Sequence, residues 1–188
     1  MRPIQFILIA LCSALPLVSR AQYLTNAPAT EIENFELQTD TLMVKGFGET
    51  GSVSTEGGAV SVRCKESSNV TINRKLYGIS VALDTNQAHG SLAVDYDELD
   101  ELIRALDFLA KISYEVTPMP SFDASFTTRS GLRIGAHSQS RQGAIELYLQ
   151  FDGTAKIPLT PDQFTRFQNL ITEAKSSLDV TKGKSSSP

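Results

Sequence analysis

The chain has 188 residues, of which 41% are hydrophobic, and its formal charge is −4. This length suits a single domain with a sizeable hydrophobic core. The acidic balance argues against general binding to nucleic acid or to an anionic membrane, because both require clustered lysine and arginine.

The first 21 residues are typical of a cleavable secretory signal peptide. A positive residue, Arg2, precedes an apolar stretch from Ile4 to Val18, and Ser19 and Ala21 supply the small residues of a cleavage site. The stretch is too short to span a bilayer, which takes roughly 20 residues. An uncleaved anchor is the alternative, but the polar sequence after Ala21 favours cleavage. We therefore expect a secreted or periplasmic protein with no membrane span after the signal is removed.

Removal of the signal peptide changes both the charge and the cysteine content. It takes Arg2 and Arg20 away, so 15 basic side chains remain against 21 acidic ones and the formal charge becomes −6. Cys12 leaves as well, and Cys64 is then the only cysteine, which excludes an internal disulfide. Because Cys64 continues the alternating apolar pattern of residues 59–65, we interpret it as a small core residue. A catalytic or intermolecular thiol is the alternative.

Residues 22–40 are polar, and we expect them to form a loosely ordered N-terminal arm. Apolar and polar side chains then alternate, as in strands, at residues 41–47, 52–56, 59–65 and 77–84. A short apolar lead-in, residues 90–94, precedes a helix over residues 95–112. Asp95 and Glu98 fit a capping box at its start. The apolar stripe of this helix consists of Leu99, Leu102, Ile103, Leu106 and Leu109.

The pattern restarts after the proline-containing segment 117–120. Alternation again predicts strands, at residues 121–128, 132–138, 144–152 and 155–159. A second helix follows over residues 160–178, with Thr160 as N-cap, Pro161 at the first helical position and Gln163 in a capping box. Its apolar stripe consists of Phe164, Phe167, Leu170, Ile171 and Ala174.

The two helix starts superimpose at an offset of 65 residues, which indicates an internal duplication. The matched pairs are Leu92 with Ile157, Val94 with Leu159, Asp95 with Thr160, Glu98 with Gln163, Leu99 with Phe164, Leu102 with Phe167, and Leu106 with Ile171. Gly78 also matches Gly143. If the second copy has a shorter loop, Val60, Val62 and Cys64 match Leu132, Ile134 and Ala136. The alternative is two unrelated strand-and-helix segments of one α+β fold.

The sequence therefore predicts an α+β fold of two antiparallel ββββα repeats, residues 41–113 and 121–178, packed into one domain. One four-stranded sheet with one helix has too little core to be stable alone, and two copies can cover each other's apolar faces. Residues 179–188 have little to bury and are expected to form a disordered tail.

The segment from Lys156 to Phe164, which leads into the second helix, resembles the end of the positive-cofactor-four transcriptional coactivator domain. That domain is a four-stranded antiparallel sheet followed by a helix. The duplicated arrangement is also similar to the Whirly and Pur folds, which bind single-stranded nucleic acid with basic and aromatic residues on their strands. The resemblance implies nucleic-acid binding, but function does not follow from fold alone. This chain departs from those families because it is acidic and its strands carry few lysines, so a nucleic-acid partner is not favoured.

Strand alternation places one group of polar side chains on the faces directed away from the helices. Arg63 and Lys65 belong to this group in the first repeat, and Arg133, His137 and Tyr148 belong to it in the second. We predict that these five side chains form a mildly basic face with one aromatic residue, which is what single-strand binding would use. The alternative is an ordinary solvated sheet face.

Three further motifs do not indicate a catalytic or metal site. His137 with Ser138 and Ser140 lacks both a nucleophile elbow and an acid placed to orient the histidine. Asn69 begins an Asn-Val-Thr glycosylation acceptor, which matters only in a eukaryotic secretory host. Helix-dipole pairing and solvation, rather than calcium binding, explain the acids Asp95, Asp97, Glu98, Asp100 and Glu101, which lack the spacing of an EF-hand loop.

We expect no cofactor, no metal ion and no enzymatic activity. The leading hypothesis is an exported binding module whose unknown protein or surface partner meets an open sheet face or a sheet edge, and an oligomer is compatible with it. The alternative from another class is single-stranded nucleic-acid binding. An enzyme ranks third, and it would gain support from a cleft in which His137 lies beside a carboxylate and a hydroxyl.

Overall fold

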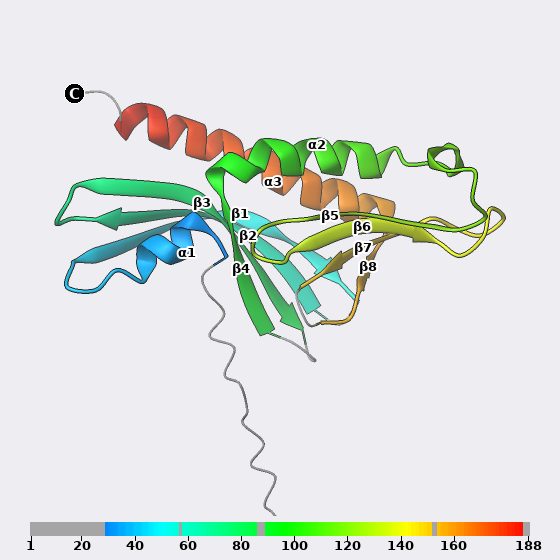
Figure 1. Cartoon of the computed structure of the whole chain (residues 1–188), viewed down its shortest axis with the longest axis horizontal. Coiled ribbons are helices and arrows are strands. Elements are labelled where there is room, and N and C mark those ends of the chain that lie inside the picture. Colours follow the sequence, from blue (N-terminus) through cyan, green and yellow to red (C-terminus); the bar gives the residue numbers. More distant parts are fainter. Residues whose placement is uncertain (1–28, 57, 86–88, 152–153, 186–188) are drawn as a thin grey trace, which may run out of the picture.

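The computed structural model describes residues 29–56, 58–85, 89–151 and 154–185, so the predicted signal peptide lies outside the described residues. Figure 1 shows two strand-rich units with two long helices along one side. The elements in chain order are α1 (Glu31–Glu36), β1 (Met43–Thr55), β2 (Gly58–Asn69), β3 (Arg74–Thr85), β4 (His89–Asp95), the 3₁₀ helix η1 (Tyr96–Glu98), α2 (Leu99–Ala110), the 3₁₀ helix η2 (Tyr114–Val116), β5 (Phe122–Thr127), β6 (Arg133–Ser138), β7 (Glu146–Gln150), β8 (Ile157–Leu159) and α3 (Pro161–Ser185).

Each unit is one antiparallel sheet whose strands lie in sequence order. The first sheet has the order β1-β2-β3-β4 and the second has the order β5-β6-β7-β8. A helix follows the last strand of each sheet, α2 after β4 and η1, and α3 after β8. The α+β class and the two ββββα repeats are thereby confirmed.

Two of the strand assignments in the first repeat are corrected. The segments 41–47 and 52–56 belong to one strand, β1, and the lead-in 90–94 belongs to the fourth strand, β4. The glycine-containing segment that suggests a turn is a β-bulge between Glu49 and Gly51. Gly51 has a φ of 151°, and a Cβ there would lie 2.8 Å from Leu170 Cδ2 of α3. A glycine therefore lets the bulged strand pass close beneath the helix.

Cross-strand registers show which positions of the two sheets are equivalent. Ile79 lies opposite Cys64 in β2 and Val94 in β4. Leu147 occupies the same place in the second sheet, opposite Ala136 in β6 and Leu159 in β8. The registers thus agree with the predicted matches of Cys64 with Ala136 and of Val94 with Leu159.

The match of Gly78 with Gly143 is wrong. Gly78 lies within β3 opposite Asp95, whereas Gly143 lies in the turn before β7 and donates its N–H to the carbonyl of Ser140. A Cβ at Gly78 would come within 2.4 Å of the Val94 carbonyl oxygen. Glycine is needed there for the close approach of β3 and β4, whereas a Cβ at Gly143 would come no nearer than 3.3 Å to its neighbours.

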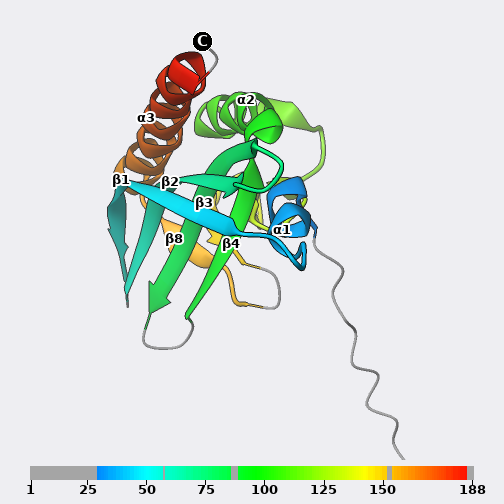
Figure 2. The same ribbon diagram turned by 90° about the vertical axis from the view of Figure 1, so that its left-hand side faces the viewer.

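The two helices are exchanged between the units. The helix of the first unit, α2, contacts β5 and β6 of the second sheet, whereas α3 lies chiefly across β1 and β2 of the first sheet. In Figure 2, α3 lies above β1 and β2. Leu102 and Leu106 of α2 and Phe167 and Leu170 of α3 are fully buried in one core that both sheets share. Each unit therefore supplies the helix that covers the other unit's sheet.

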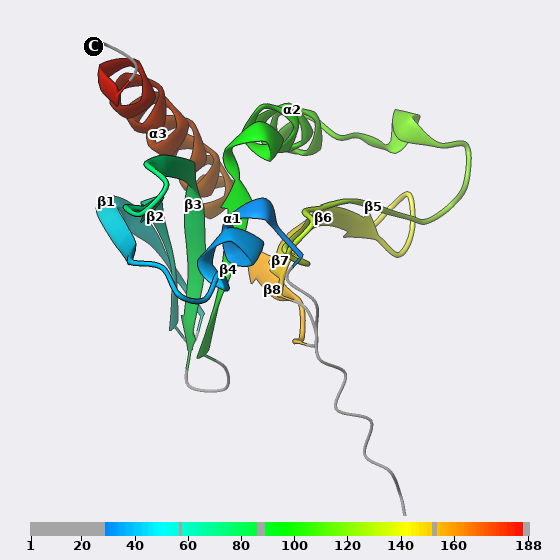
Figure 3. The same ribbon diagram turned by 60° about the vertical axis from the view of Figure 1, so that its left-hand side comes forward.

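Both ends of the described chain are more regular than expected. Within the expected loose arm, residues 31–36 form α1, which begins with a complete capping box at Thr30 and buries Ile32 and Phe35. This helix lies on the face of the first sheet opposite α3 (Figure 3). At the other end, α3 continues to Ser185 into the expected disordered tail. Leu178 is buried beside the core and ties down the part of α3 before this extension.

Candidate binding surfaces

Three of the five predicted site residues lie together on the outer face of the second sheet. Arg133, His137 and Tyr148 meet there with two residues that the sequence did not single out, Asp123 of β5 and Lys156 before β8. The Tyr148 hydroxyl donates to Asp123 Oδ1 at 2.8 Å, and Lys156 Nζ donates to Asp123 Oδ2 at 2.8 Å. The Lys156 ammonium also lies 4.0 Å from the centre of the Tyr148 ring. We call these five residues the second-sheet cluster.

Tyr148 is not the open aromatic platform that strand alternation suggested. Its side chain is on the outer face but is only 1% exposed. The ring lies over Gly135, where a Cβ would come within 2.5 Å of the Tyr148 ring. Lys156 and the edge of the His137 ring cover it further. A ligand base or ring could not stack on Tyr148 without displacing these neighbours.

The charges of the second-sheet cluster are largely satisfied within it. Burial raises the pKa of Asp123, but hydrogen bonds from Lys156 and Tyr148 outweigh burial and lower that pKa below its ordinary value. The hydrogen bond from Lys156 to Asp123 in turn raises the lysine pKa. Arg133 donates to Ser125 Oγ at 2.9 Å and lies 3.9 Å from Asp123. The cluster is therefore a packed polar layer with little unpaired charge for a ligand.

Arg63 and Lys65 lie on the first sheet, so the five residues do not form one basic face. Arg63 pairs with Glu49 at 3.0 Å, and Lys65 pairs with Glu36 of α1 at 2.8 Å. Glu36 also pairs with Lys45 at 2.6 Å. The helix α1, which the sequence did not predict, brings this carboxylate onto the outer face and neutralises the lysines there.

His137 has a carboxylate partner, and the hydroxyl of the neighbouring Ser138 is engaged elsewhere. His137 Nε2 lies 3.2 Å from Glu146 Oε2, beside a cavity of about 210 Å³. The Ser138 hydroxyl points to the other face and is bonded to Tyr114 and to the carbonyl of Ser140. His137 Nδ1 is buried and has no hydrogen-bond partner among the described residues. Ser138 is therefore not placed as a nucleophile for this histidine to activate.

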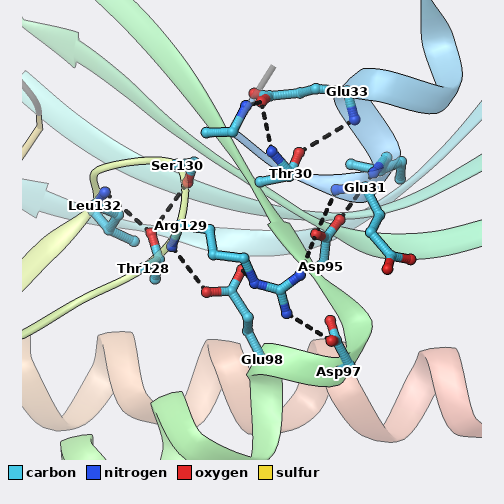
Figure 4. A network of polar contacts seen from close by, with 12 residues as sticks. Thr30, Glu31, Glu33, Asp95, Asp97, Glu98, Thr128, Arg129, Ser130 and Leu132 are labelled. Carbon is cyan, nitrogen blue, oxygen red and sulfur yellow. Dashed lines mark hydrogen bonds and ion pairs between the residues drawn. The ribbon is translucent and has the colours of Figure 1, made fainter. Parts of the chain in front are cut away.

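The predicted capping box of Asp95 and Glu98 is wrong, because both carboxylates serve other partners. Asp95 accepts hydrogen bonds from the N–H groups of Glu31, at 2.7 Å, and Ile32, at 3.0 Å, in the first turn of α1 (Figure 4). Arg129, in the turn between β5 and β6, pairs with Asp95 at 3.0 Å. Its backbone N–H donates to Glu98 Oε1 at 2.9 Å. Solvation therefore does not explain these two acids.

The exposed hydrophobic side chains gather at one end of the first sheet. Six of the ten large hydrophobic side chains exposed in the described part of the chain occur within residues 37–47 and 70–72. In Figure 1 the turn between β2 and β3 and the chain entering β1 lie at the same end of the molecule. The N–H of Val70 donates to the carbonyl of Leu42 at 2.9 Å, which joins the two segments. We call this surface the apolar tip, and it comprises Leu37, Leu42, Val44, Phe47, Val70 and Ile72.

Asn69 organises the apolar tip from beneath. It is only 2% exposed, and its Oδ1 accepts hydrogen bonds from the Thr41 hydroxyl at 2.6 Å and from the N–H groups of Thr71 and Ile72. Its amide nitrogen donates to Gln38 Oε1 at 2.8 Å. The nitrogen that a glycan would need is thus buried and engaged, which argues against glycosylation of folded protein at Asn69.

Cys64 is half-buried between β2 and α3, where its thiol lies 3.4 Å from the carbonyl oxygen of Ala174. The described residues contain no group of three or more His, Cys, Asp or Glu side chains arranged to hold a metal ion. Within the same residues, no helix is both long enough and apolar enough to cross a bilayer.

Comparison with protein-family models, with curated proteins and with solved structures finds no match. The resemblance to the positive-cofactor-four, Whirly and Pur folds therefore remains a prediction, and function has to be inferred from the surfaces described above.

Proposed function

We propose that this chain is an exported, non-enzymatic binding module that docks a partner protein on the apolar tip. The observation that carries the proposal is the concentration of exposed hydrophobic side chains at this end of the first sheet. Exposed apolar groups that are scattered singly need no explanation, whereas a concentration of them at one end of a sheet is typical of an interaction site.

Hydrogen bonds within the chain order part of the apolar tip. The hydrogen bonds of Asn69 fix the turn that carries Val70 and Ile72, and they also fix the chain at Thr41 that leads into Leu42. A surface that is already ordered loses less conformational entropy on binding. This supports recognition of a partner rather than accidental exposure of core residues.

Two other functions receive less support. Single-strand binding would need cations and stacking surfaces on an open sheet, but Arg63, Lys65 and Lys156 are ion-paired and Tyr148 is covered. We expect no salt-dependent binding to a single-stranded oligonucleotide. Hydrolysis would need a hydroxyl beside His137, and the nearby Ser138 hydroxyl is bonded elsewhere.

A random twelve-residue peptide library displayed on phage tests the proposal, because it presents many apolar segments to the purified protein. Phe47 and Phe108 are equally exposed, at 58% and 57%, so Phe47→Ser and Phe108→Ser form a matched pair. Peptides selected on the wild-type protein should bind Phe47→Ser about tenfold more weakly and Phe108→Ser unchanged. Selected peptides that are insensitive to Phe47→Ser, or equally sensitive to Phe108→Ser, would contradict it.

A further inference from the structure

We propose that the partner binds as an extended strand added to the free edge of β1, and that it places lysine or arginine side chains at alternate positions into a groove between β1 and α3. This inference rests on the proposed function and names the mode of binding and the chemistry of the partner. Strand addition supplies affinity through backbone hydrogen bonds and specificity through the side chains on each face.

The free edge is the outer side of β1. This strand has 13 residues and is the first in the order β1-β2-β3-β4, so in the described part of the chain β2 is its only hydrogen-bonded strand neighbour. At its far end, the carbonyl of Ser54 already accepts a hydrogen bond from Gln163 of α3. The exposed run from Val44 to Glu49 is the part open to a partner. A long exposed edge of this kind is a template for another strand.

A groove follows this edge under α3, which runs antiparallel to β1. Gly51 lies against Leu170, and Cys64, opposite Gly48, lies against Ala174. The groove has a volume of about 480 Å³. It is lined by Glu49 and Thr50 of β1 and by Asn169, Thr172, Glu173 and Ser176 of α3.

Gly46 and Gly48 lie on the side of β1 that faces α3, next to the groove, and the packing of the chain itself does not require glycine at either position. They lie opposite Glu66 and Cys64, so their missing side chains would point to the same face as the Cys64 thiol, toward α3. A Cβ would lie 3.8 Å from the Glu66 Cβ or 3.6 Å from the Cys64 Cβ, which are ordinary contacts. Glycine weakens a strand interior and often marks a place where another backbone or ligand approaches closely.

The groove offers hydrogen-bond acceptors. The Thr172 hydroxyl donates to the carbonyl of Gln168, and the Ser176 hydroxyl donates to the carbonyl of Thr172, both within α3. Because each hydroxyl proton is already used, the two hydroxyl oxygens can only accept hydrogen bonds from a ligand. The described residues give Glu173 no ion-pair partner, whereas Glu49 is paired with Arg63. Arg166 lies near Gly51, about two helical turns before Glu173 in α3. Cationic side chains of the partner therefore belong beside Glu173, away from Arg166.

A second copy of this chain fits the groove less well than a basic partner. In a pairing of β1 with β1, the side chains directed into each groove would come from Val44, Gly46, Gly48 and Thr50, which carry no positive charge. The exported chain is itself acidic, with a formal charge of −6 by the residue count above. A segment with alternating basic and apolar residues supplies the missing charge and places its apolar side chains on the face of Phe47.

Two synthetic nine-residue peptides test the inference on the purified secreted chain. One alternates lysine with valine and the other alternates serine with valine, and binding is followed by backbone amide shifts in NMR. We expect shifts within residues 43–50, and about fivefold tighter binding of the lysine peptide. Glu173→Gln should remove most of this difference, and Glu115→Gln, an exposed acid elsewhere, should leave it intact. Gly46→Val should keep cooperative unfolding and weaken both peptides about tenfold, because the new side chain would project on the α3 side of β1, where the basic side chains of the partner strand are proposed to lie.

The outcomes separate the inference from the proposed function. Equal binding of the two peptides at β1 would overturn the cationic preference. Strand addition would be overturned if Gly46→Val bound both peptides as tightly as the wild type does. It would also be overturned if no amide shifts appeared at residues 43–50. In either case, library peptides that depend on Phe47 would still support the apolar tip as the docking surface. A single dimeric species whose interface protects the β1 amides would instead identify a second copy as the occupant and would overturn the inference.

Discussion

Arg129 places its Nη1 atom 3.0 Å from Oδ2 of Asp95, and this ion pair joins the two repeats. Asp95 ends the first sheet, and Arg129 lies in the first turn of the second sheet. The same carboxylate holds the first turn of α1. Three segments that are distant in sequence thus meet at one acid (Figure 4).

Replacing Arg129 should destabilise the protein strongly. Asp95 and Glu98 have side chains that are only 5% and 9% exposed, so Arg129→Met leaves two buried carboxylates without their cation. We expect a loss of about 3 kcal/mol in the free energy of unfolding, measured with urea. Asp97→Asn is the control, because Asp97 pairs with the same arginine but is mostly exposed, and it should cost less than about 1 kcal/mol. Equal losses of stability in Arg129→Met and Asp97→Asn would show that the buried carboxylates do not depend on Arg129.

Adding a methyl group at Gly135 should disturb the second sheet. A Cβ there would come within 2.5 Å of the Tyr148 ring, so Gly135→Ala must displace the ring and its bond to Asp123. We expect a loss of about 2 kcal/mol in the free energy of unfolding. Gly90→Ala in β4 is the matched change, because a Cβ at Gly90 meets nothing within 4 Å. A neutral Gly135→Ala would show that Tyr148 does not lie over this glycine.

The contact between α1 and the first sheet should weaken in acid. Burial raises the pKa of Glu36, but hydrogen bonds from Lys45, Lys65 and Ser67 outweigh burial and lower it. A carboxylate whose pKa is lower in the folded state stabilises the protein above its unfolded pKa, about 4.3, and loses that effect as the pH falls through the folded value.

Glu36→Gln should therefore be less stable than the wild type at pH 7, and the difference should shrink toward pH 3. Urea unfolding across this range measures both curves. The exposed Glu56 provides the control, because the free energy of unfolding of Glu56→Gln should change with pH as that of the wild type does. A difference between wild type and Glu36→Gln that stays constant with pH would mean that Glu36 is not ion-paired in solution.

The exchanged helices make the two repeats depend on each other. Because α2 covers the second sheet and α3 covers the first, a chain divided between Met119 and Pro120 should give two fragments that are unfolded alone. Mixing the fragments should restore the circular dichroism and NMR dispersion of the intact protein. A dispersed spectrum from the N-terminal fragment alone would show that the first sheet does not need α3.

Much of the fold could be predicted because its signals are local. Apolar spacing and the capping residues Thr160 and Gln163 indicate where the second helix starts, and the structure shows both capping hydrogen bonds. The bulge at Glu49 and Gly51 was missed because a glycine-rich turn and a bulge have the same composition. The helix α1 was missed because only two of its residues are buried, too few for a periodic signal.

The site was harder to predict because it depends on partners from distant segments. Alternation identifies the outer face of a strand, but it cannot show that Lys65 meets Glu36 or that Lys156 covers Tyr148. Asp95 and Glu98 have the spacing of a capping box, yet Arg129, about 30 residues away, decides their role. The apolar tip had no sequence signal, because exposure of Leu42, Val70 and Ile72 follows from the fold.

An NMR map of the bound surface tests the central claim most directly. The chain from residue 22 onward, uniformly labelled with ¹⁵N, is titrated with a peptide selected from the random library, and amide shifts are assigned along both sheets. We predict that the largest shifts fall within residues 37–50 and 70–72. The largest shifts within residues 122–159, on the second sheet, would contradict the claim that the partner docks on the first.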